Sequence, residues 1–274
     1  MTTTALGPLD STRLWDNPDA VRLYRGFCRK HPRYRQANAE LIRHAALEPG
    51  LTVLDLGAGL GGTAAVALGA MGGRGRGRVI AVEPAGAMRE AGARMTDRGI
   101  EWHAEIPDGC RPDRILCGAG IWQLTPLTDA LSLLRDRLAP GAALCFNIPA
   151  VYLGEPDPPG GGRDPQLLEL AARLTQGEPP AAGGAPEGWE PLPDAAGMES
   201  MLRGAAFRAE GWEFSLRLTQ AAWRDWLKLP ACSAPLLPGL TSKERAARID
   251  AAFARCDPRS WRWERWRGWT AWAE

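Results

Sequence analysis

A glycine-rich turn follows an apolar segment near the start of the chain. Residues 52–56 read TVLDL, and residues 57–62 read GAGLGG. Glycine lets the backbone turn tightly and lets a ligand approach it closely. Glu83 ends the next apolar segment, and its carboxylate can accept hydrogen bonds from two ribose hydroxyls. Together these residues predict a site for an adenosine-containing ligand at the carboxyl edge of a parallel sheet.

Apolar strands and helical segments alternate through the first half of the chain. The hydrophobic pattern predicts strands at residues 51–56, 78–82, 100–103, 114–117 and 142–147. Helices are expected between them at 63–71, 87–97 and 127–138. The first strand is almost wholly apolar, as expected when a sheet is covered on both faces. This alternation predicts an α/β fold with a Rossmann-like, doubly wound and mostly parallel sheet.

Four segments of different character make up the 274 residues. We expect a helical cap over 1–48, a ligand-binding core over 49–150 and a closing strand over 260–274. Lid and substrate-binding insertions, including one helix and one strand of the core, are expected over 151–259. Within them, Gly and Pro crowd residues 153–196 around one helical island at 166–175. Such a stretch is either disordered or a lid over a site.

The last segment alternates tryptophan with polar residues from Trp261 onward, which is the period of a half-buried strand. Arginine and tryptophan together could instead stack on the bases of single-stranded nucleic acid. The net charge of only +1 favours the strand, because it gives no field that attracts nucleic acid or an anionic membrane.

Composition also argues against metal, secretion and membrane insertion. The six cysteines form no C-x-x-C pair and only three histidines are present, so no metal site is expected. The N-terminus does not resemble a signal peptide, and no apolar run reaches the ~20 residues of a membrane span. We therefore expect a cytoplasmic protein with reduced cysteines.

The motifs in residues 20–150 together resemble the class I S-adenosylmethionine-dependent methyltransferases. That family has an apolar strand with an acidic residue before G-x-G-x-G, here VLDLGAGLG over 53–61. An acidic residue ends its second strand, here Glu83, and a Pro-Gly turn precedes its fifth strand, here at Pro140. The resemblance implies seven strands with the last antiparallel, a helical lid, and S-adenosylmethionine as cofactor, leaving S-adenosylhomocysteine as product.

The resemblance also implies which residues hold this cofactor. Asp55 would order the turn and bond the amino-acid end, and Glu83 would hold the ribose. Where the family often has Asp-Ala-Glu after strand three, this chain has His103-Ala104-Glu105, so the adenine contact at His103 differs from the family pattern. The remaining cofactor contacts are expected from Gly57, Ala58, Gly59, Gly61, Pro84, Met88, Cys117 and Gly118.

Catalytic and substrate-binding residues are expected from the cap and from the loop after strand four. Tyr24, His31 and Tyr34 are predicted to face the pocket, although a histidine before a proline is also typical of a solvated turn. Many relatives carry His-Trp where this chain has Trp122-Gln123, so an obvious base is missing there. The aromatic face could stabilise a sulfonium by cation–π attraction. Further substrate contacts are expected from Tyr152, Trp223 and Trp226.

Several functions remain open at this stage. The aromatic character of the lid favours transfer of a methyl group to an O, C or N atom of a small metabolite or natural product. A macromolecular substrate would need a basic docking surface, and the net charge of +1 argues against one. The six residues 57–62 also fit G-x-G-x-x-G, which is typical of nicotinamide-dependent oxidoreductases. A protein that keeps the cofactor site but performs other chemistry is the remaining alternative.

Overall fold

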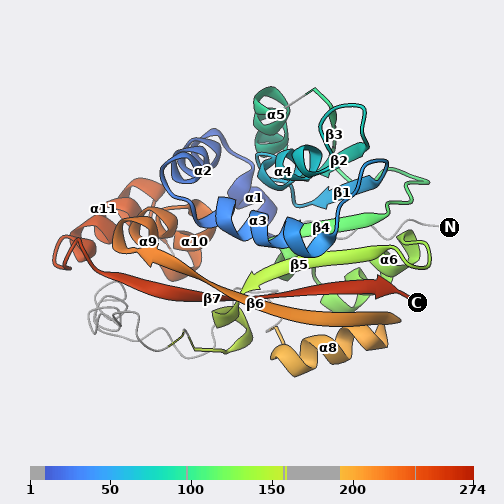
Figure 1. The fold of residues 1–274 in the computed structure, drawn as a ribbon. Helices are drawn as coiled ribbons and strands as arrows, with labels where there is room; N and C mark the ends of the chain where they lie inside the picture. Colours follow the sequence, from blue (N-terminus) through green and yellow to red (C-terminus); the bar gives the residue numbers. More distant parts are fainter. Residues whose placement is uncertain (1–9, 97, 157, 159–191, 238) are drawn as a thin grey trace.

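The computed structural model describes residues 10–96, 98–156, 158, 192–237 and 239–274. Its centre is a seven-stranded sheet with the order β3-β2-β1-β4-β5-β7-β6 (Figure 1). Five neighbouring strands run parallel, and β7 runs antiparallel to both β5 and β6. The strands are β1 Thr52–Leu56, β2 Arg78–Val82, β3 Ile100–His103, β4 Arg114–Gly118, β5 Ala143–Pro149, β6 Phe207–Thr219 and β7 Trp261–Ala273.

Helices cover both faces of this sheet and cap one end of it (Figure 1). The N-terminal helices are α1 Asp10–Trp15, α2 Pro18–Lys30 and α3 Arg33–Ala45. The helices between strands are α4 Gly62–Ala70, α5 Gly86–Met95, α6 Leu127–Arg137 and α8 Ala195–Gly204. A C-terminal group comprises α9 Gln220–Leu227, α10 Pro230–Leu236 and α11 Ser242–Phe253. Single 3₁₀ turns occur at η1 Ile121–Gln123 and η2 Ala150–Leu153.

Alternate residues of the central strands enter two different cores. Leu54 of β1 packs with α6 and α8 on one face, whereas its neighbour Val53 packs with α3 and α4 on the other. Successive strand side chains point to opposite faces, so only a strand that is apolar on both sides can sit between two helical layers. The almost wholly apolar first strand therefore has the environment that its sequence predicts.

Strands β6 and β7 are longer than the rest of the sheet. All thirteen residues of each strand are paired, from Phe207 opposite Ala273 to Thr219 opposite Trp261. Only residues 266–272 of β7 also pair with β5, so the two strands continue beyond the core as a ribbon toward α9–α11 (Figure 1). Trp266 and Trp269, in the part beside β5, are 0% and 1% exposed. The aromatic tail is thus a strand of the core.

A buried ion pair joins the cap to this ribbon. Arg33 at the start of α3 donates from Nε and Nη2 to the two carboxylate oxygens of Glu264, each over 2.8 Å. Trp266 donates to the same carboxylate, and the rings of Tyr34, Trp226 and Trp266 surround the guanidinium at 5.0–5.1 Å. This pair holds α3 close to the carboxyl ends of the parallel strands.

The α/β fold, the mostly parallel seven-stranded sheet and the antiparallel last strand are confirmed. One helix was missed, because α10 begins at Pro230 in a seven-residue segment without a clear period. The helix predicted at 166–175 lies outside the described residues. Among the helices that the structure describes, every one is too short or too polar to span a bilayer.

Candidate cofactor and acceptor site

The glycine turn connects β1 to α4 through a left-handed backbone. Gly57, Gly59 and Gly61 have φ angles of +71°, +55° and +79°, which residues with a side chain adopt only with strain. The amides of Gly57 and Ala58 donate to the carbonyl oxygen of Val82 over 2.9 and 3.0 Å. These two bonds fasten the turn to the end of β2 and bring it beside Glu83.

Glu83 lies directly after β2, and both of its carboxylate oxygens reach backbone amides. Oε2 accepts from the Gly59 amide over 2.7 Å, and Oε1 accepts from the Ala85 amide over 2.9 Å. The side chain is 8% exposed, and burial raises the pKa of its carboxyl group. Each oxygen retains a second lone pair, so the carboxylate can still accept from a ligand.

Asp55 orders the start of helix α4. Its Oδ2 accepts from the Ala64 amide over 2.9 Å, and the side chain is 1% exposed. Burial raises the pKa of this carboxyl to about 7, against the lowering effect of the Ala64 amide. The sequence prediction that Asp55 orders the turn agrees with this bond, while its predicted contact with a ligand stays a prediction.

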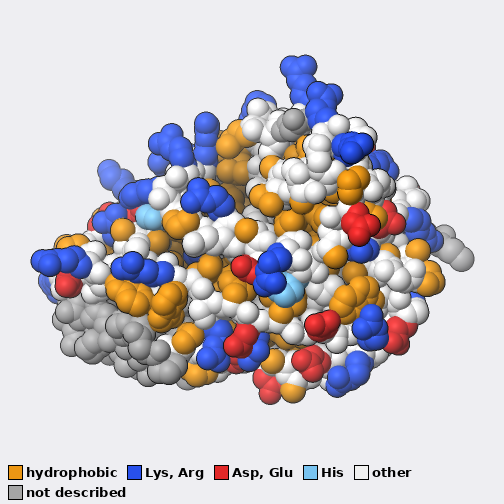
Figure 2. All heavy atoms as spheres, viewed as in Figure 1, with side chains coloured by type: hydrophobic (Ala, Val, Ile, Leu, Met, Phe, Trp, Pro, Cys, Tyr) orange, Lys and Arg blue, Asp and Glu red, His pale blue; other side chains and the backbone are white. Residues whose placement is uncertain are grey.

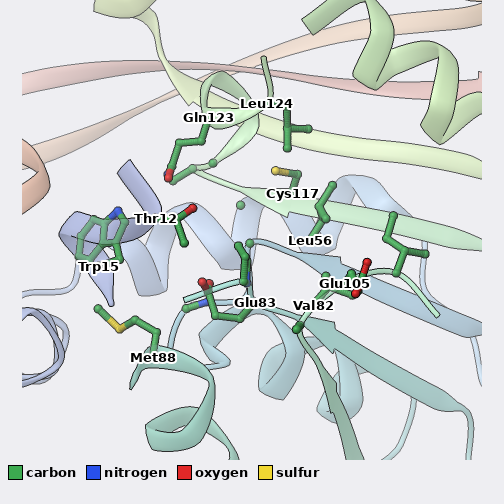
Figure 3. A pocket seen from close by; sticks show the side chains of 18 of the residues that line it. Thr12, Trp15, Leu56, Val82, Glu83, Met88, Glu105, Cys117, Gln123 and Leu124 are labelled. Atoms are coloured by element: carbon green, nitrogen blue, oxygen red, sulfur yellow. The ribbon is translucent and has the colours of Figure 1, made fainter. Parts of the chain in front are cut away.

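A cavity of about 300 Å³ opens over Glu83 and the glycine turn. This volume is at the lower end of the range for small-molecule sites. Glu83 occupies the middle of the cavity wall, with Thr12, Trp15 and Met88 on one side and Glu105 on the other (Figure 3). On the molecular surface, hydrophobic side chains are visible between α2 and α5, next to basic side chains (Figure 2).

Most of the predicted cofactor residues are brought together around this cavity. The nine that line it are Gly57, Gly59, Glu83, Pro84, Met88, Ala104, Glu105, Cys117 and Gly118.

The other four predicted residues, Asp55, Ala58, Gly61 and His103, are absent from the described lining. A β-carbon on Gly61 would lie 2.7–2.8 Å from Thr96 and Trp102, so this glycine permits close packing against β3. Ala58 packs in the core under α3 and α4. The backbone oxygen of His103 accepts from the Glu83 amide over 2.9 Å. Ligand contacts from Ala58, Gly61 and His103 are not shown by this lining and stay predictions.

The aromatic side chains of the N-terminal cap form a continuous wall along the cavity. Tyr24 and Tyr34 line it as predicted, and Trp15 joins them. The Trp15 and Tyr24 rings meet edge to face, with centroids 5.4 Å apart at 72°. Tyr24 and Tyr34 are 5.6 Å apart at 56°. A β-carbon at Gly59 would lie 3.6 Å from the Tyr24 ring, so this wall stands directly over the glycine turn.

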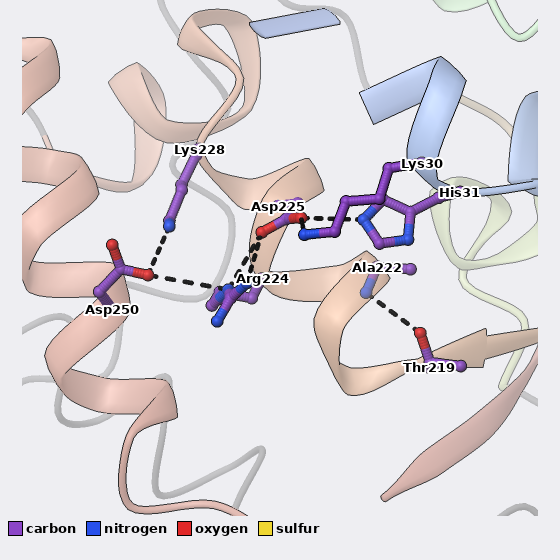
Figure 4. Close-up of polar contacts among 8 residues, drawn as sticks. All are labelled: Lys30, His31, Thr219, Ala222, Arg224, Asp225, Lys228 and Asp250. Atoms are coloured by element: carbon purple, nitrogen blue, oxygen red, sulfur yellow. Dashed lines mark hydrogen bonds and ion pairs between the residues drawn. The ribbon is translucent and has the colours of Figure 1, made fainter. Parts of the chain in front are cut away.

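His31 does not face the cavity, and its prediction as a catalytic residue facing the pocket is corrected. Its Nε2 lies 2.9 Å from Oδ2 of Asp225 in α9, and the ring is 7% exposed (Figure 4). Lys30 donates to the same oxygen over 2.7 Å, and Arg224 bonds the other oxygen. Partial burial favours the protonated carboxyl, but the hydrogen bonds from Lys30, His31 and Arg224 outweigh it and hold the pKa of Asp225 well below its usual range. The break between α2 and α3 therefore anchors the cap to α9.

The residues predicted for the acceptor are divided between the cavity and the packing behind it. Gln123 lines the cavity, whereas Trp122 stacks on Tyr152 with centroids 4.8 Å apart. Trp226 donates from Nε1 to the Tyr34 hydroxyl over 3.0 Å. Trp223 packs among the C-terminal helices with the Arg262 guanidinium 3.2 Å from its ring centroid. Direct substrate contacts from Trp122, Tyr152, Trp223 and Trp226 are thus not shown by the described lining.

Sequence reasoning missed the residues that loops and the first helix bring to the cavity. Trp15 and Thr12 belong to no sequence motif. The tryptophan in a short helix before Pro18 was the one feature that could have indicated this part of the lining. The others lie in the loops after β3 and β4 or on α6. They are Ile106, Asp108, Ala119, Gly120, Leu124, Thr125, Leu133 and Arg137.

No group of three or more His, Cys, Asp or Glu side chains suited to a metal ion occurs within the described ranges.

Comparison with known proteins supports the fold at low sequence identity. No protein-family model matches the chain, and no curated protein sequence matches it. Among solved structures, the YcgJ protein of Bacillus subtilis superposes with a TM-score of 0.54 at 13% identity, covering 88% of this chain and 99% of that one. A Geobacter sulfurreducens S-adenosylmethionine-dependent methyltransferase in complex with S-adenosylhomocysteine has a TM-score of 0.52 at 14% identity, covering 87% and 91%.

A third similar structure, the [4+2]-cyclase SpnF, has a TM-score of 0.52 at 14% identity and covers 86% of this chain and 80% of its own. The strand order, the antiparallel β7 and these superpositions define the fold. The chain has the Rossmann-like fold of the class I S-adenosylmethionine-dependent methyltransferases.

Proposed function

We propose that this chain is an S-adenosylmethionine-dependent methyltransferase that methylates a small metabolite or natural product. The observation that carries the proposal is the position of Glu83. Its carboxylate is buried on the cavity wall and hydrogen-bonded to the glycine turn, next to a lining that combines apolar and polar side chains. The cofactor's ribose, placed there, would meet a charged acceptor. The cofactor's amino-acid end would then lie over the glycines.

The residues present fit the cofactor at both ends. Glycine at position 59 leaves the turn open beneath Tyr24, where a larger residue would fill the space. The lining also contains the apolar residues Ile106, Leu124 and Leu133, together with Asp108. Apolar walls with a few polar groups suit a purine ring. Asp108 and Glu105, instead of His103, are the acceptors that we assign to the adenine amino group.

The bound cofactor would supply an activated methyl group on a sulfonium, so the protein's own contribution is to position the acceptor and exclude water. Alignment of this kind can lower a barrier by roughly 7–11 kcal/mol. Tyr24 and Tyr34 close the cavity from the cap, and Asn147 holds the loop after β4 by accepting from the Ala119 amide over 2.9 Å. The acceptor would lie between these two elements.

A second candidate keeps the cofactor site but performs a different reaction. One observation favours it: the described acceptor side of the cavity carries no histidine, so acid–base catalysis of an oxygen acceptor has no obvious agent there. One protein of similar fold, the [4+2]-cyclase SpnF, is named for a reaction other than methyl transfer. An oxidoreductase that binds a nicotinamide is a third reading.

We place the protein in a reducing compartment such as the cytoplasm, with a small molecule as its partner in the reaction. None of the six cysteines forms a disulfide, and Cys117 and Cys145 are buried in core strands, which supports this location.

The function is tested by comparing two glycine-to-arginine variants for stabilisation by S-adenosylhomocysteine. Gly59→Arg should abolish the rise in melting temperature that the ligand gives the wild type, because the new side chain fills the turn under Tyr24. Gly73→Arg is the matched control, since Gly73 also has a left-handed φ of +89° but has open space around it. Stabilisation that survives Gly59→Arg would refute this position of the site.

A further inference from the structure

None of the three histidines is available as a base at the acceptor side of the described cavity. His31 is bonded to Asp225, and the His44 ring is stacked on Trp212 with centroids 4.1 Å apart. His103 is absent from the described lining. An acceptor that must lose a proton before it attacks, such as an aliphatic alcohol, needs a base within hydrogen-bond reach.

The carboxylates of the lining do not supply that base either. Glu83 accepts hydrogen bonds from two backbone amides, and its remaining lone pairs are assigned to the cofactor's ribose. Glu105 lies on the side of the cavity opposite Trp15 and Thr12 (Figure 3), and Asp108 follows it in the loop after β3. The cap residues of the lining, Thr12, Trp15, Tyr24 and Tyr34, are neutral, and so is Gln123 of η1.

The two tyrosines of this side remain protonated at neutral pH. Burial raises the pKa of Tyr34 to about 12 and that of Tyr24 well above its usual range. The Tyr34 oxygen accepts from Trp226, which leaves its own O–H to donate into the cavity. Neither phenol can act as a base, but Tyr34 can orient a substrate that carries a hydrogen-bond acceptor.

The same side is suited to a positive charge. Trp15 and Tyr24 meet at 72°, so their rings form two walls of a corner beside the cavity. Across the whole lining, the three carboxylates Glu83, Glu105 and Asp108 outnumber the one cation, Arg137. The Arg33 guanidinium behind Tyr34 is neutralised by Glu264. Aromatic faces attract ammonium groups, and most strongly where water is excluded.

We propose that the acceptor is an amine nitrogen that is uncharged in the complex, with a tertiary amine as the preferred class; this rests on the proposed methyltransferase function. The nitrogen lone pair forms a bond to the methyl carbon while the carbon–sulfur bond breaks, and that bond's electron pair stays on sulfur. The positive charge moves from sulfur to nitrogen, and a tertiary amine releases no proton in that step. An aliphatic tertiary amine is mostly protonated at neutral pH, so it releases that proton to bulk water before it enters the closed site; the transfer itself then needs no base, and the aromatic corner faces the ammonium product.

The proposal is tested by the affinity of a quaternary ammonium for the protein saturated with S-adenosylhomocysteine. Choline serves as the mimic of an ammonium product, and 3,3-dimethyl-1-butanol is its neutral isostere of the same shape. Calorimetry should show choline binding roughly 2- to 30-fold more tightly than the isostere, the range that a cation–π contact of about 0.5–2 kcal/mol gives at 1.4 kcal/mol per tenfold. Trp15→Leu should remove most of this preference, and Trp15→Phe should keep it.

Three results would overturn the inference. Equal affinity for choline and the isostere would show that charge is not recognised, and an unchanged preference in Trp15→Leu would place the ammonium elsewhere. Choline that competes with S-adenosylhomocysteine would show that the aromatic corner belongs to the cofactor's own subsite. Absence of S-adenosylhomocysteine binding to wild type would instead refute the proposed function, and this inference with it.

Discussion

Replacement of Glu83 by glutamine should weaken S-adenosylhomocysteine binding far more than its small change in shape suggests. Both carboxylate oxygens accept backbone amides, from Gly59 over 2.7 Å and from Ala85 over 2.9 Å. A glutamine side chain has one oxygen and one NH₂ group, so one of these two amides would face a donor. The ribose would also lose its charged acceptor.

The expected size follows from the bonds that change. A hydrogen bond to a charged group contributes about 1.5–3 kcal/mol, so loss of one bond to a ribose hydroxyl predicts roughly 10- to 150-fold weaker binding. Protein stability should change less. The amide left without an acceptor costs about 1–3 kcal/mol, while removal of a buried charge offsets part of that loss.

Isothermal titration of S-adenosylhomocysteine into Glu83→Gln and into Glu101→Gln gives the measurement. Glu101 is a matched control, because it lies in the adjacent strand β3, is exposed, and pairs with Arg78 at the surface. Its substitution should leave the dissociation constant unchanged, since surface ion pairs contribute little. Equal affinities for Glu83→Gln and wild type would refute the assignment of the ribose to Glu83.

Three further predictions concern the structure that supports the site. Burial raises the pKa of Asp55 to about 7, so the folded protein holds this proton more tightly than the unfolded chain does. The stability that this group contributes therefore falls as pH rises from about 4 to 7. The melting temperature of Asp55→Asn relative to wild type should rise over that interval and then level off. Gly92→Ala should lower the free energy of unfolding by about 1–3 kcal/mol, because its β-carbon would lie 2.3 Å from the Trp102 indole of β3. Gly69→Ala is the control, since open space surrounds that glycine and no such loss is expected. Equal urea midpoints for the two variants would contradict this packing. Glu264→Leu should cost about 3–5 kcal/mol by leaving Arg33 buried and unpaired, and adding Arg33→Met should recover much of that loss in urea unfolding; simply additive losses would argue against the pair.

Hydrophobic periodicity and the Gly and Pro residues at turns were sufficient to predict the strands of the sheet. The apolar strand before the glycine turn, the helix ending at Pro140-Gly141 and the alternating tail all formed the elements expected of them. The antiparallel last strand came from the family resemblance. Strand order and register were not predicted, since local patterns do not specify which strands become neighbours. The short α10 shows the limit of periodicity, because seven residues with two prolines carry too little signal.

The site residues also separate into those that local motifs predict and those that depend on long-range contacts. Glu83 and the glycines are fixed by local backbone geometry, so a motif could place them. His31 and Trp226 were predicted from residue type alone, and their contacts depend on partners 192–194 residues away in the sequence. Instead of reaching the cavity, the His31 ring contacts Asp225 and the Trp226 indole donates to Tyr34. No single-sequence pattern specifies such long-range partners.

The most direct test of the account is calorimetric titration of the purified protein with S-adenosylhomocysteine, with NADH titrated in parallel. We predict micromolar binding of S-adenosylhomocysteine with one site per chain, and no binding of NADH. Binding of NADH alone would contradict the methyltransferase assignment and would make the glycine turn and Glu83 a dinucleotide site.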